Sequence, residues 1–383
     1  MKKIVIPLLV FTLVFLNLSA VRPIPAAAAP PPPLEISARS AILINADTGA
    51  VVFEKNSLER RAMASTTKIM SALLTLEAGN LDRQFTVDSM AIRIEGSTMG
   101  LREGDIVTRR ALCAGMLLPS GNDASQAAAV SVSGSIPEFV KLMNERAQEL
   151  GLRDTRFANP SGLDADGHYS TAYDLALLTM FAMGDEEFAR MTAQQAMRVE
   201  FGNPPFGRWL NNNNKLLHMY EGAVGTKTGF TDNARRCLVS TAIRDGVTLI
   251  AVTLNAHDDW NDHMKMFNYG FSVVKNQPVD YDLSDFYVNI AGGGKERAAV
   301  RLAEIPTLAL SDAEMRLVEI KAVIIPFIYA GFGAGEQVGL LEFYYNGRLL
   351  KAVPLVTAEA CESPAERLTF TAGLVQFWRR SLF

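Results

Sequence analysis

The sequence has little of several features that define protein classes. Its three cysteines, Cys113, Cys237 and Cys361, are too few for a disulfide framework. With 28 glycines in 383 residues it is not collagen-like, and with 49% hydrophobic residues it is too apolar for an intrinsically disordered chain. The formal net charge of −4 gives no electrostatic footprint for nucleic acid. The length predicts two or three globular domains.

The apolar run near the N-terminus is short. It covers residues 4–16, which is 13 residues, whereas a transmembrane helix needs about 20. Lys2 and Lys3 precede the run and Ala26–Ala29 follow it, which is typical of a secretory signal peptide. We therefore expect a signal peptide over residues 1–29, with a retained membrane anchor as the alternative.

The rest of the chain divides by composition and pattern. A stiff, proline-rich spacer over residues 30–35 precedes a mixed α/β domain over 36–275. Residues 276–358 contain short apolar runs between glycines and prolines, which indicates a small, separate β domain. Residues 363–383 predict a terminal helix.

Hydrophobic periodicity predicts the elements of the larger domain. The expected strands are a hairpin over 40–54 and runs at 224–231, 237–243 and 247–254. The expected helices lie at 65–77, 108–118, 123–132, 136–150, 171–183 and 259–273. The polar, proline- and asparagine-rich stretch 202–214 predicts a loop.

Ser65-Thr66-Thr67-Lys68 opens one of the predicted helices. Residues three apart share a helix face, so the Lys68 amine can reach the Ser65 hydroxyl. A serine hydroxyl needs an adjacent base to act as a nucleophile, and lysine serves only when burial or a neighbouring cation lowers its pKa. Taken alone, the pattern fits the polar first turn of a surface helix equally well.

Two polar tripeptides follow. Ser120-Gly121-Asn122 lies between predicted helices, where its asparagine or the next aspartate could equally be a helix cap. Lys227-Thr228-Gly229 lies in a predicted strand. Its glycine would let a substrate backbone approach closely, and its lysine and threonine offer a cation and a hydroxyl to an anion. The same tripeptide also fits an edge strand with a solvated lysine.

The order Ser-x-x-Lys, Ser-x-Asn, Lys-Thr-Gly matches the signature of penicillin-binding proteins and class A β-lactamases. The sequences around the motifs resemble the low-molecular-weight penicillin-binding proteins, the family of serine-type D-Ala-D-Ala carboxypeptidases. The resemblance covers residues 36–275 well and the remainder more loosely. Its segments are Ala64–Met70, Pro119–Ala124, Asn159–Asp164, Gly167–Ala172 and Gly225–Thr231.

This resemblance implies a fold and a set of roles. The fold is of the mixed α+β class: a serine β-lactamase/transpeptidase-like domain with an antiparallel sheet flanked by helices, a small C-terminal all-β domain and a terminal amphipathic helix. Ser65 would be the acylated nucleophile. Lys68 would be its general base, and a nearby Lys227 would lower the pKa of Lys68 by like-charge repulsion.

The remaining roles come from the same resemblance. Ser120 would relay a proton to the leaving amine and to the deacylating water, and Asn122 would hold the substrate amide. The backbone N–H groups of Ser65 and Phe230 would form the oxyanion hole.

The third motif would hold the end of the substrate. Lys227 and Thr228 would bind its terminal carboxylate, beside Gly229. The chain departs from the family here, because Asn233-Ala234-Arg235-Arg236 stands where the family often has Ala-Gly, and no proline precedes the nucleophile. Neither change removes a catalytic group. We expect no cofactor and no metal, since the histidines and acids of 257–263 have no standard zinc spacing.

The chain ends in a predicted amphipathic helix. Ser363-Pro364-Ala365-Glu366 is a capping box with proline at the first helical position. Towards Phe383, one half of the helical wheel gathers leucine, phenylalanine, valine and tryptophan, and the other half carries arginine, glutamine and glutamate, as in interfacial membrane helices. The helix is expected to bind the membrane surface. Docking of the same face on the β domain is the alternative.

We therefore expect an exported enzyme at the outer face of the cytoplasmic membrane. It would remove the terminal D-alanine from peptidoglycan stem peptides ending in D-Ala-D-Ala, and β-lactams would acylate it at Ser65. The alternatives are a β-lactamase, a DD-endopeptidase and, from another class, a non-catalytic wall-binding scaffold. The lack of an obvious Glu-x-x-x-Asn segment in the right region and the extra β domain argue against a class A β-lactamase.

Overall fold

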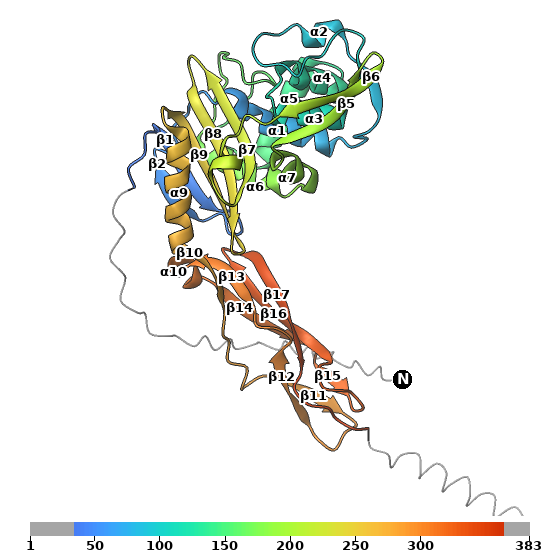
Figure 1. Ribbon diagram of the computed structural model, residues 1–383. Helices are drawn as coiled ribbons and strands as arrows, with labels where there is room; N and C mark the ends of the chain where they lie inside the picture. The colour runs from blue at the N-terminus through green and yellow to red at the C-terminus, as the bar shows by residue number, and fades with distance from the viewer. Residues whose placement is uncertain (1–33, 364–383) are drawn as a thin grey trace, which may run out of the picture. The chain divides into compact units, whose positions relative to one another are not determined.

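A five-stranded antiparallel sheet forms the centre of the larger domain (Figure 1). The computed structural model describes residues 34–363, without the side chains of residues 90 and 91. The strand order is β2-β1-β9-β8-β7, which places β7 at an edge of the sheet. The strands are β1 (Ser40–Asn45), β2 (Val51–Lys55), β7 (Ala223–Thr231), β8 (Arg235–Arg244) and β9 (Val247–Ala256). Every strand expected in this domain is confirmed.

Helices pack on both faces of this sheet. Figure 1 shows α9 in front of the strands and α6 behind them, and both helices contact β9. All six residues of β1 are buried, as expected for a strand that is covered on both faces. The helical elements are η1 (Ala64–Thr67), α1 (Lys68–Glu77), α2 (Ser89–Ile92), α3 (Arg109–Leu117), α4 (Asn122–Ser133), α5 (Ile136–Glu149), α6 (Ala172–Met183), α7 (Glu186–Thr192), α8 (Leu216–Met219) and α9 (Asp259–Val273).

Helix α1 is the centre of the helical part. It contacts α3, α4 and α6, and its residues from Lys68 to Leu76 are all buried. A helix that is buried on all sides belongs to a core, so the alternative of a surface helix is wrong. The chain therefore places Ser65 and Lys68 at the start of a core helix.

One expectation about this domain is wrong. The stretch 202–214, expected as a loop, contains β6 (Pro205–Asn211), which pairs along its whole length with β5 (Ala196–Gly202). The backbone partner in β5 outweighs the low strand propensity of proline and asparagine. Pro205 stands at the first position of the strand, where a missing N–H is tolerated. With β3 (Gln84–Thr86) and β4 (Ile106–Thr108), the two strands complete a four-stranded sheet.

The three cysteines are free and buried. Burial raises the pKa of the Cys237 thiol to about 12, and it also raises the pKa of Cys113. A thiol that stays protonated is a poor nucleophile, so both side chains act as small apolar residues.

A C-terminal β domain is present, as expected. Its six-stranded sheet has the order β14-β16-β17-β12-β11-β15, and β10 pairs with β13. The elements are β10 (Val274–Pro278), β11 (Tyr287–Ala291), β12 (Arg297–Leu302), β13 (Thr307–Ser311), α10 (Asp312–Met315), β14 (Glu319–Ile324), β15 (Phe327–Tyr329), β16 (Gln337–Tyr345) and β17 (Arg348–Thr357).

The architecture confirms the expected fold class, a mixed α+β domain whose antiparallel sheet is flanked by helices, followed by a β domain. The proposed signal peptide and residues 364–383 of the terminal helix lie outside the described residues. Between residues 34 and 363, no helix is both long and apolar enough to cross a bilayer.

Candidate active site

Ser65 lies in the 3-10 turn η1, immediately before α1. The predicted helix is confirmed, but its first turn is tighter than an α-helical one. Ala64, just before the serine, has a φ of +47°, which non-glycine residues rarely adopt. This turn leaves Ser65 half-buried, and the residue lines a cavity.

The Lys68 amine lies beneath the serine and is fully buried. Its Nζ donates to Ser65 Oγ at 2.9 Å, to Asn122 Oδ1 at 2.7 Å and to the carbonyl oxygen of Ser161 at 2.6 Å. Burial and, next, the positive charge of Lys227 lower the pKa of Lys68 well below its usual value, while Asp123 opposes them. The expected influence of Lys227 is present, but burial is the larger cause.

A lowered pKa changes what the amine can do. A neutral amine has two N–H donors and one lone pair. It can keep its bonds to Asn122 and Ser161 and turn the lone pair to the Ser65 hydroxyl. The geometry therefore allows Lys68 to accept the proton of Ser65.

The carbonyl of Ser161 is a contact that the sequence analysis did not identify. Asn159 Oδ1 accepts hydrogen bonds from the backbone N–H groups of Ser161 at 3.2 Å and Gly162 at 2.7 Å, which fixes the turn. Gly162 has a φ of +89° and packs directly on the backbone of η1. The Asn-Pro-Ser-Gly sequence is a recognisable turn, but nothing in it shows that a carbonyl faces a lysine.

The Ser120-Gly121-Asn122 motif lies at the start of α4. Ser120 has a φ of +66° and lines the cavity. Asn122 donates from Nδ2 to the carbonyl of Glu95 at 2.7 Å, so both ends of its amide are engaged. The alternative of a helix cap is wrong, because Gly121 is the N-cap and no side chain caps the helix.

Asp123 is a further residue whose role the sequence did not reveal. Its carboxylate is buried and accepts hydrogen bonds from the backbone N–H groups of Met99 and Leu101, both at 2.9 Å. It therefore anchors the loop between α2 and β4 to the start of α4, directly after Ser120-Gly121-Asn122.

Lys227 is almost completely buried, so the alternative of a solvated edge lysine is wrong. Its Nζ donates to the carbonyl of Thr228 at 2.8 Å. Burial lowers the pKa of Lys227 to about 7. Its charge acts on Lys68, whose pKa it helps to lower, and the next three residues, Thr228, Gly229 and Phe230, line the cavity.

Gly229 allows β7 to pack against the η1 turn that carries Ser65. A Cβ atom added to it would lie 3.0 Å from the backbone nitrogen of Ser65 and 3.1 Å from the Cβ of Ala64. The close approach expected at this glycine is therefore made by the chain's own η1 turn. It places the backbone N–H of Ser65 beside the strand that carries Phe230.

These residues surround a cavity of about 350 Å³. Ser65, Ser120, Thr228, Gly229 and Phe230 line it, whereas Lys68, Asn122 and Lys227 are buried side chains. The other lining residues are Ser97, Asn213, Lys215, Arg236, Cys237, Asp259 and Trp260. In the part of the chain from 34 to 363, no three histidine, cysteine or acidic side chains gather in a way that could hold a metal ion.

The fold and the arrangement of Ser65 and Lys68 beside the cavity together define a class of protein. A serine hydroxyl that a buried lysine amine contacts, in a cavity bordered by an edge strand, is the arrangement of an acyl-transfer enzyme with a serine nucleophile and a lysine base.

Comparisons with known proteins agree with this class of enzyme and indicate which family within it the chain resembles. A family model described as D-alanyl-D-alanine carboxypeptidase matches residues 25–258. DacF of Bacillus subtilis, named a D-alanyl-D-alanine carboxypeptidase, is 33% identical over 355 residues, which are 90% of this chain and 89% of the relative. DacC of Escherichia coli, with the same description, is 30% identical over 346 residues and covers 85% of each chain.

Solved structures are similar as well. A DD-transpeptidase from Streptomyces has 33% identity and a TM-score of 0.60 over 62% of this chain and 98% of its own. The D-alanyl-D-alanine carboxypeptidase DacD from Francisella tularensis has 26% identity and a TM-score of 0.62 over 88% of this chain and 97% of its own. The chain belongs to the family of D-alanyl-D-alanine carboxypeptidases, and it is a serine-type carboxypeptidase. The resemblance drawn from the motifs is confirmed.

Substituting alanine for Gly162 should misplace the nucleophile. The new Cβ would lie 2.0 Å from the carbonyl oxygen of Ala64 and 2.9 Å from the nitrogen of Ser65, so η1 must shift. A displacement near 1 Å can cost about 100-fold in rate, and we expect a loss of that order in acylation by labelled penicillin. Gly167→Ala is the control, because it also has a positive φ but meets only Arg156 at 3.4 Å. Equal losses in both variants would assign the effect to backbone strain alone.

The buried Lys227 should make stability depend on pH. Between pH 7 and 10.5 its amine is neutral in the folded chain and protonated in the unfolded one, so the free energy of unfolding should rise with pH, by at most about 1.4 kcal/mol per unit. Below pH 7 both states are protonated and the contribution is constant. Urea unfolding at pH 7, 8 and 9 should show a shallower rise for Lys227→Met than for the wild type. Lys215→Met, at an exposed lysine, should keep the wild-type slope. Parallel curves for the wild type and Lys227→Met would contradict the expected titration.

Proposed function

We propose that this carboxypeptidase removes the terminal D-alanine of peptidoglycan stem peptides through an acyl-enzyme on Ser65. The observation that carries the proposal is the 2.9 Å contact between the Lys68 amine and the Ser65 hydroxyl. Burial and a neighbouring lysine favour the neutral form of that amine, which is the form a general base requires.

Acylation begins with proton transfer. The neutral Lys68 amine takes the proton of Ser65, whose oxygen attacks the carbonyl carbon of the penultimate D-alanine. The carbonyl oxygen becomes an oxyanion, which accepts hydrogen bonds from the backbone N–H groups of Ser65 and Phe230. One such donor contributes about 3 kcal/mol of transition-state stabilisation. The carbon–nitrogen bond then breaks, and the terminal D-alanine leaves with a proton on its amine.

Ser120 is the residue that moves this proton. It lines the same cavity as Ser65, and in the proposed mechanism its hydroxyl passes a proton from Lys68 to the leaving amine and later accepts one from the deacylating water. Asn122 holds Lys68 through Oδ1, and its Nδ2 exchanges the bond to the Glu95 carbonyl for the substrate amide.

The third motif binds the terminal carboxylate of the substrate. The Thr228 side of the cavity offers a hydroxyl, and the buried Lys227 amine adds positive charge when it is protonated. Arg236 lines the same cavity and is held by Asp259 through a 2.6 Å ion pair. A guanidinium stays charged at every relevant pH. Asp259 lines the cavity as well and balances this charge, so Arg236 offers the carboxylate an N–H donor at Nη1 rather than a net charge.

A β-lactam presents a carbonyl and a carboxylate to the same groups, so we expect it to acylate Ser65. DD-endopeptidase action on cross-links uses the same chemistry and is compatible with the site. The relatives described above are named carboxypeptidases, which favours the release of a single D-alanine.

The location follows from the proposed substrate. Peptidoglycan lies outside the cytoplasm, which agrees with a signal peptide over residues 1–29 and a proline-rich spacer at 30–35. The basic, amphipathic pattern of residues 363–383 then supports attachment to the outer face of the cytoplasmic membrane. Domains over residues 36–275 and 276–358 would lie between these two segments.

Replacing the nucleophile should abolish both activities. Ser65→Ala should form no adduct with labelled penicillin, and its release of D-alanine from a pentapeptide should fall by about 10⁴-fold or more, because no other group can take its role. Ser133→Ala, at the far end of α4, is the matched control and should behave as the wild type. An adduct of equal yield on Ser65→Ala would overturn the acyl-enzyme. Rapid hydrolysis of penicillin without release of D-alanine would show a β-lactamase instead.

Membrane attachment should depend on the last segment of the chain. The mature chain should sediment with anionic lipid vesicles, and a variant ending at residue 362 should stay in the supernatant. A buried large apolar side chain contributes about 1.5–3 kcal/mol, so a few of them suffice for binding. Both forms should react equally with labelled penicillin, which shows that the truncated chain is folded. Vesicle binding by the truncated chain would contradict the proposed anchor.

A further inference from the structure

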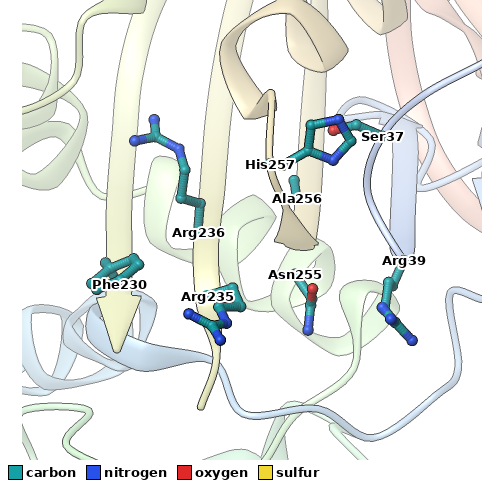
Figure 2. Close-up of a pocket in the computed structure, with 8 residues that line it drawn as sticks. All are labelled: Ser37, Arg39, Phe230, Arg235, Arg236, Asn255, Ala256 and His257. Carbon is teal, nitrogen blue, oxygen red and sulfur yellow. The ribbon is translucent and has the colours of Figure 1, made fainter. Parts of the chain in front are cut away.

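A second cavity, of about 560 Å³, lies where several strands of the central sheet end (Figure 2). Figure 2 shows Phe230 at the end of β7, Arg235 and Arg236 at the start of β8, Asn255 near the end of β9, and Arg39 on the segment that leads into β1. The remaining lining residues are Ser37, Ala256 and His257.

The lining of this cavity is basic. It includes three guanidinium groups, from Arg39, Arg235 and Arg236, and no acidic side chain. This concentration of positive charge stands out because the whole chain has a formal net charge of −4. Guanidinium groups bind carboxylates and phosphates through paired hydrogen bonds, so the cavity suits an anionic ligand.

Two of these arginines have no neutralising partner in the part of the chain that the structure describes. Among residues 34–363, neither the Arg39 nor the Arg235 side chain forms an ion pair or a side-chain hydrogen bond, and both are exposed. Arg236 differs, because its Nε and Nη2 both donate to Asp259 Oδ1. That pair leaves Nη1 of Arg236 for another acceptor.

The backbone conformation at position 235 does not favour an arginine. Arg235 has a φ of +58° and Asn255 a φ of +54°, in the left-handed region that glycine or asparagine adopts more easily. Asn255 suits its position, whereas an arginine in such a turn is disfavoured. The turn therefore does not account for an arginine at this position.

The basic cavity adjoins the active site. Phe230 and Arg236 line both cavities. The proposed roles order the substrate along the edge strand β7, with its terminal carboxylate at Thr228 and its acyl carbonyl at the N–H of Phe230. An extended peptide paired with this edge then continues past Phe230, towards the end of β7 and Arg235.

We propose that the cavity formed by Arg39, Arg235 and the free side of Arg236 binds a carboxylate that the donor peptide carries upstream of its D-Ala-D-Ala end. This inference rests on the proposed function and specifies its substrate as an acidic stem peptide. The positive charge and the residues shared with the catalytic cavity favour a carboxylate of the same peptide over a phosphate of a separate wall polymer.

The test compares two pentapeptides that end in D-Ala-D-Ala and differ only at the residue before it, which bears a free side-chain carboxylate in one and a carboxamide in the other. The wild type should prefer the free acid by about tenfold in kcat/KM, the effect of one charge-assisted contact. The double variant Arg39→Gln/Arg235→Gln should lose this preference and turn over the amidated peptide at the wild-type rate. Arg153→Gln removes an exposed arginine that lines neither cavity, and it should keep the preference.

Acylation by labelled penicillin separates this inference from the proposed function. All variants should react with penicillin at the wild-type rate, since the drug lacks the upstream carboxylate. If penicillin reacts and D-alanine is released, but the wild type shows no preference or the double variant keeps it, the carboxylate site is wrong and the proposed function stands. If the wild type neither reacts with penicillin nor releases D-alanine, the proposed function is wrong. Inhibition of the amidated peptide's turnover by poly(glycerol phosphate), lost in the double variant, would assign the cavity to a polymer phosphate and overturn the assignment to the peptide.

Discussion

The burial of the Lys68 amine is the constraint on which the rest of the structure depends. Burying a charged lysine in a protein interior is costly, so burial favours the neutral amine. Hydrogen-bond acceptors around the amine reduce this cost. Here the acceptors are the Ser65 hydroxyl, the Asn122 amide and the Ser161 carbonyl. Each comes from a different segment of the chain, so the segments must meet at one point for the amine to be accommodated.

Two glycines make that meeting possible. Gly162 lies against the carbonyl of Ala64, and Gly229 lies against the nitrogen of Ser65, so the η1 turn is enclosed between a loop and an edge strand. A side chain at either position would hold these backbones apart. The same close packing excludes water from Lys68 and Lys227, which is why burial is the main cause of the lowered pKa of both amines. The close packing around η1 thus also sets the protonation behaviour of the two buried amines.

The charges of Lys227 and of the neighbouring arginines determine which anionic groups the two cavities can bind. The buried lysine Lys227 can lose its charge near neutral pH, whereas Arg236 keeps its own and borders both the catalytic cavity and the basic cavity at the strand ends. The expectation that Lys227 and Thr228 bind the substrate carboxylate came from motif resemblance, which says nothing of the neighbouring arginines. The sequence showed Arg235 and Arg236 only as a departure from the family pattern. Their use depends on which strand ends lie side by side.

The sequence by itself determined the elements and the class of enzyme. Apolar spacing located α1, α9 and the central strands, because periodicity reports which face of an element is buried. The ordered motifs predicted the contact between Ser65 and Lys68, because their local spacing on one turn already brings them together. Only the tertiary structure decided the contacts that span the chain. They include the Ser161 carbonyl on Lys68 and the pairing of β6 with β5 despite its proline, since backbone groups and distant partners leave no pattern in composition or periodicity.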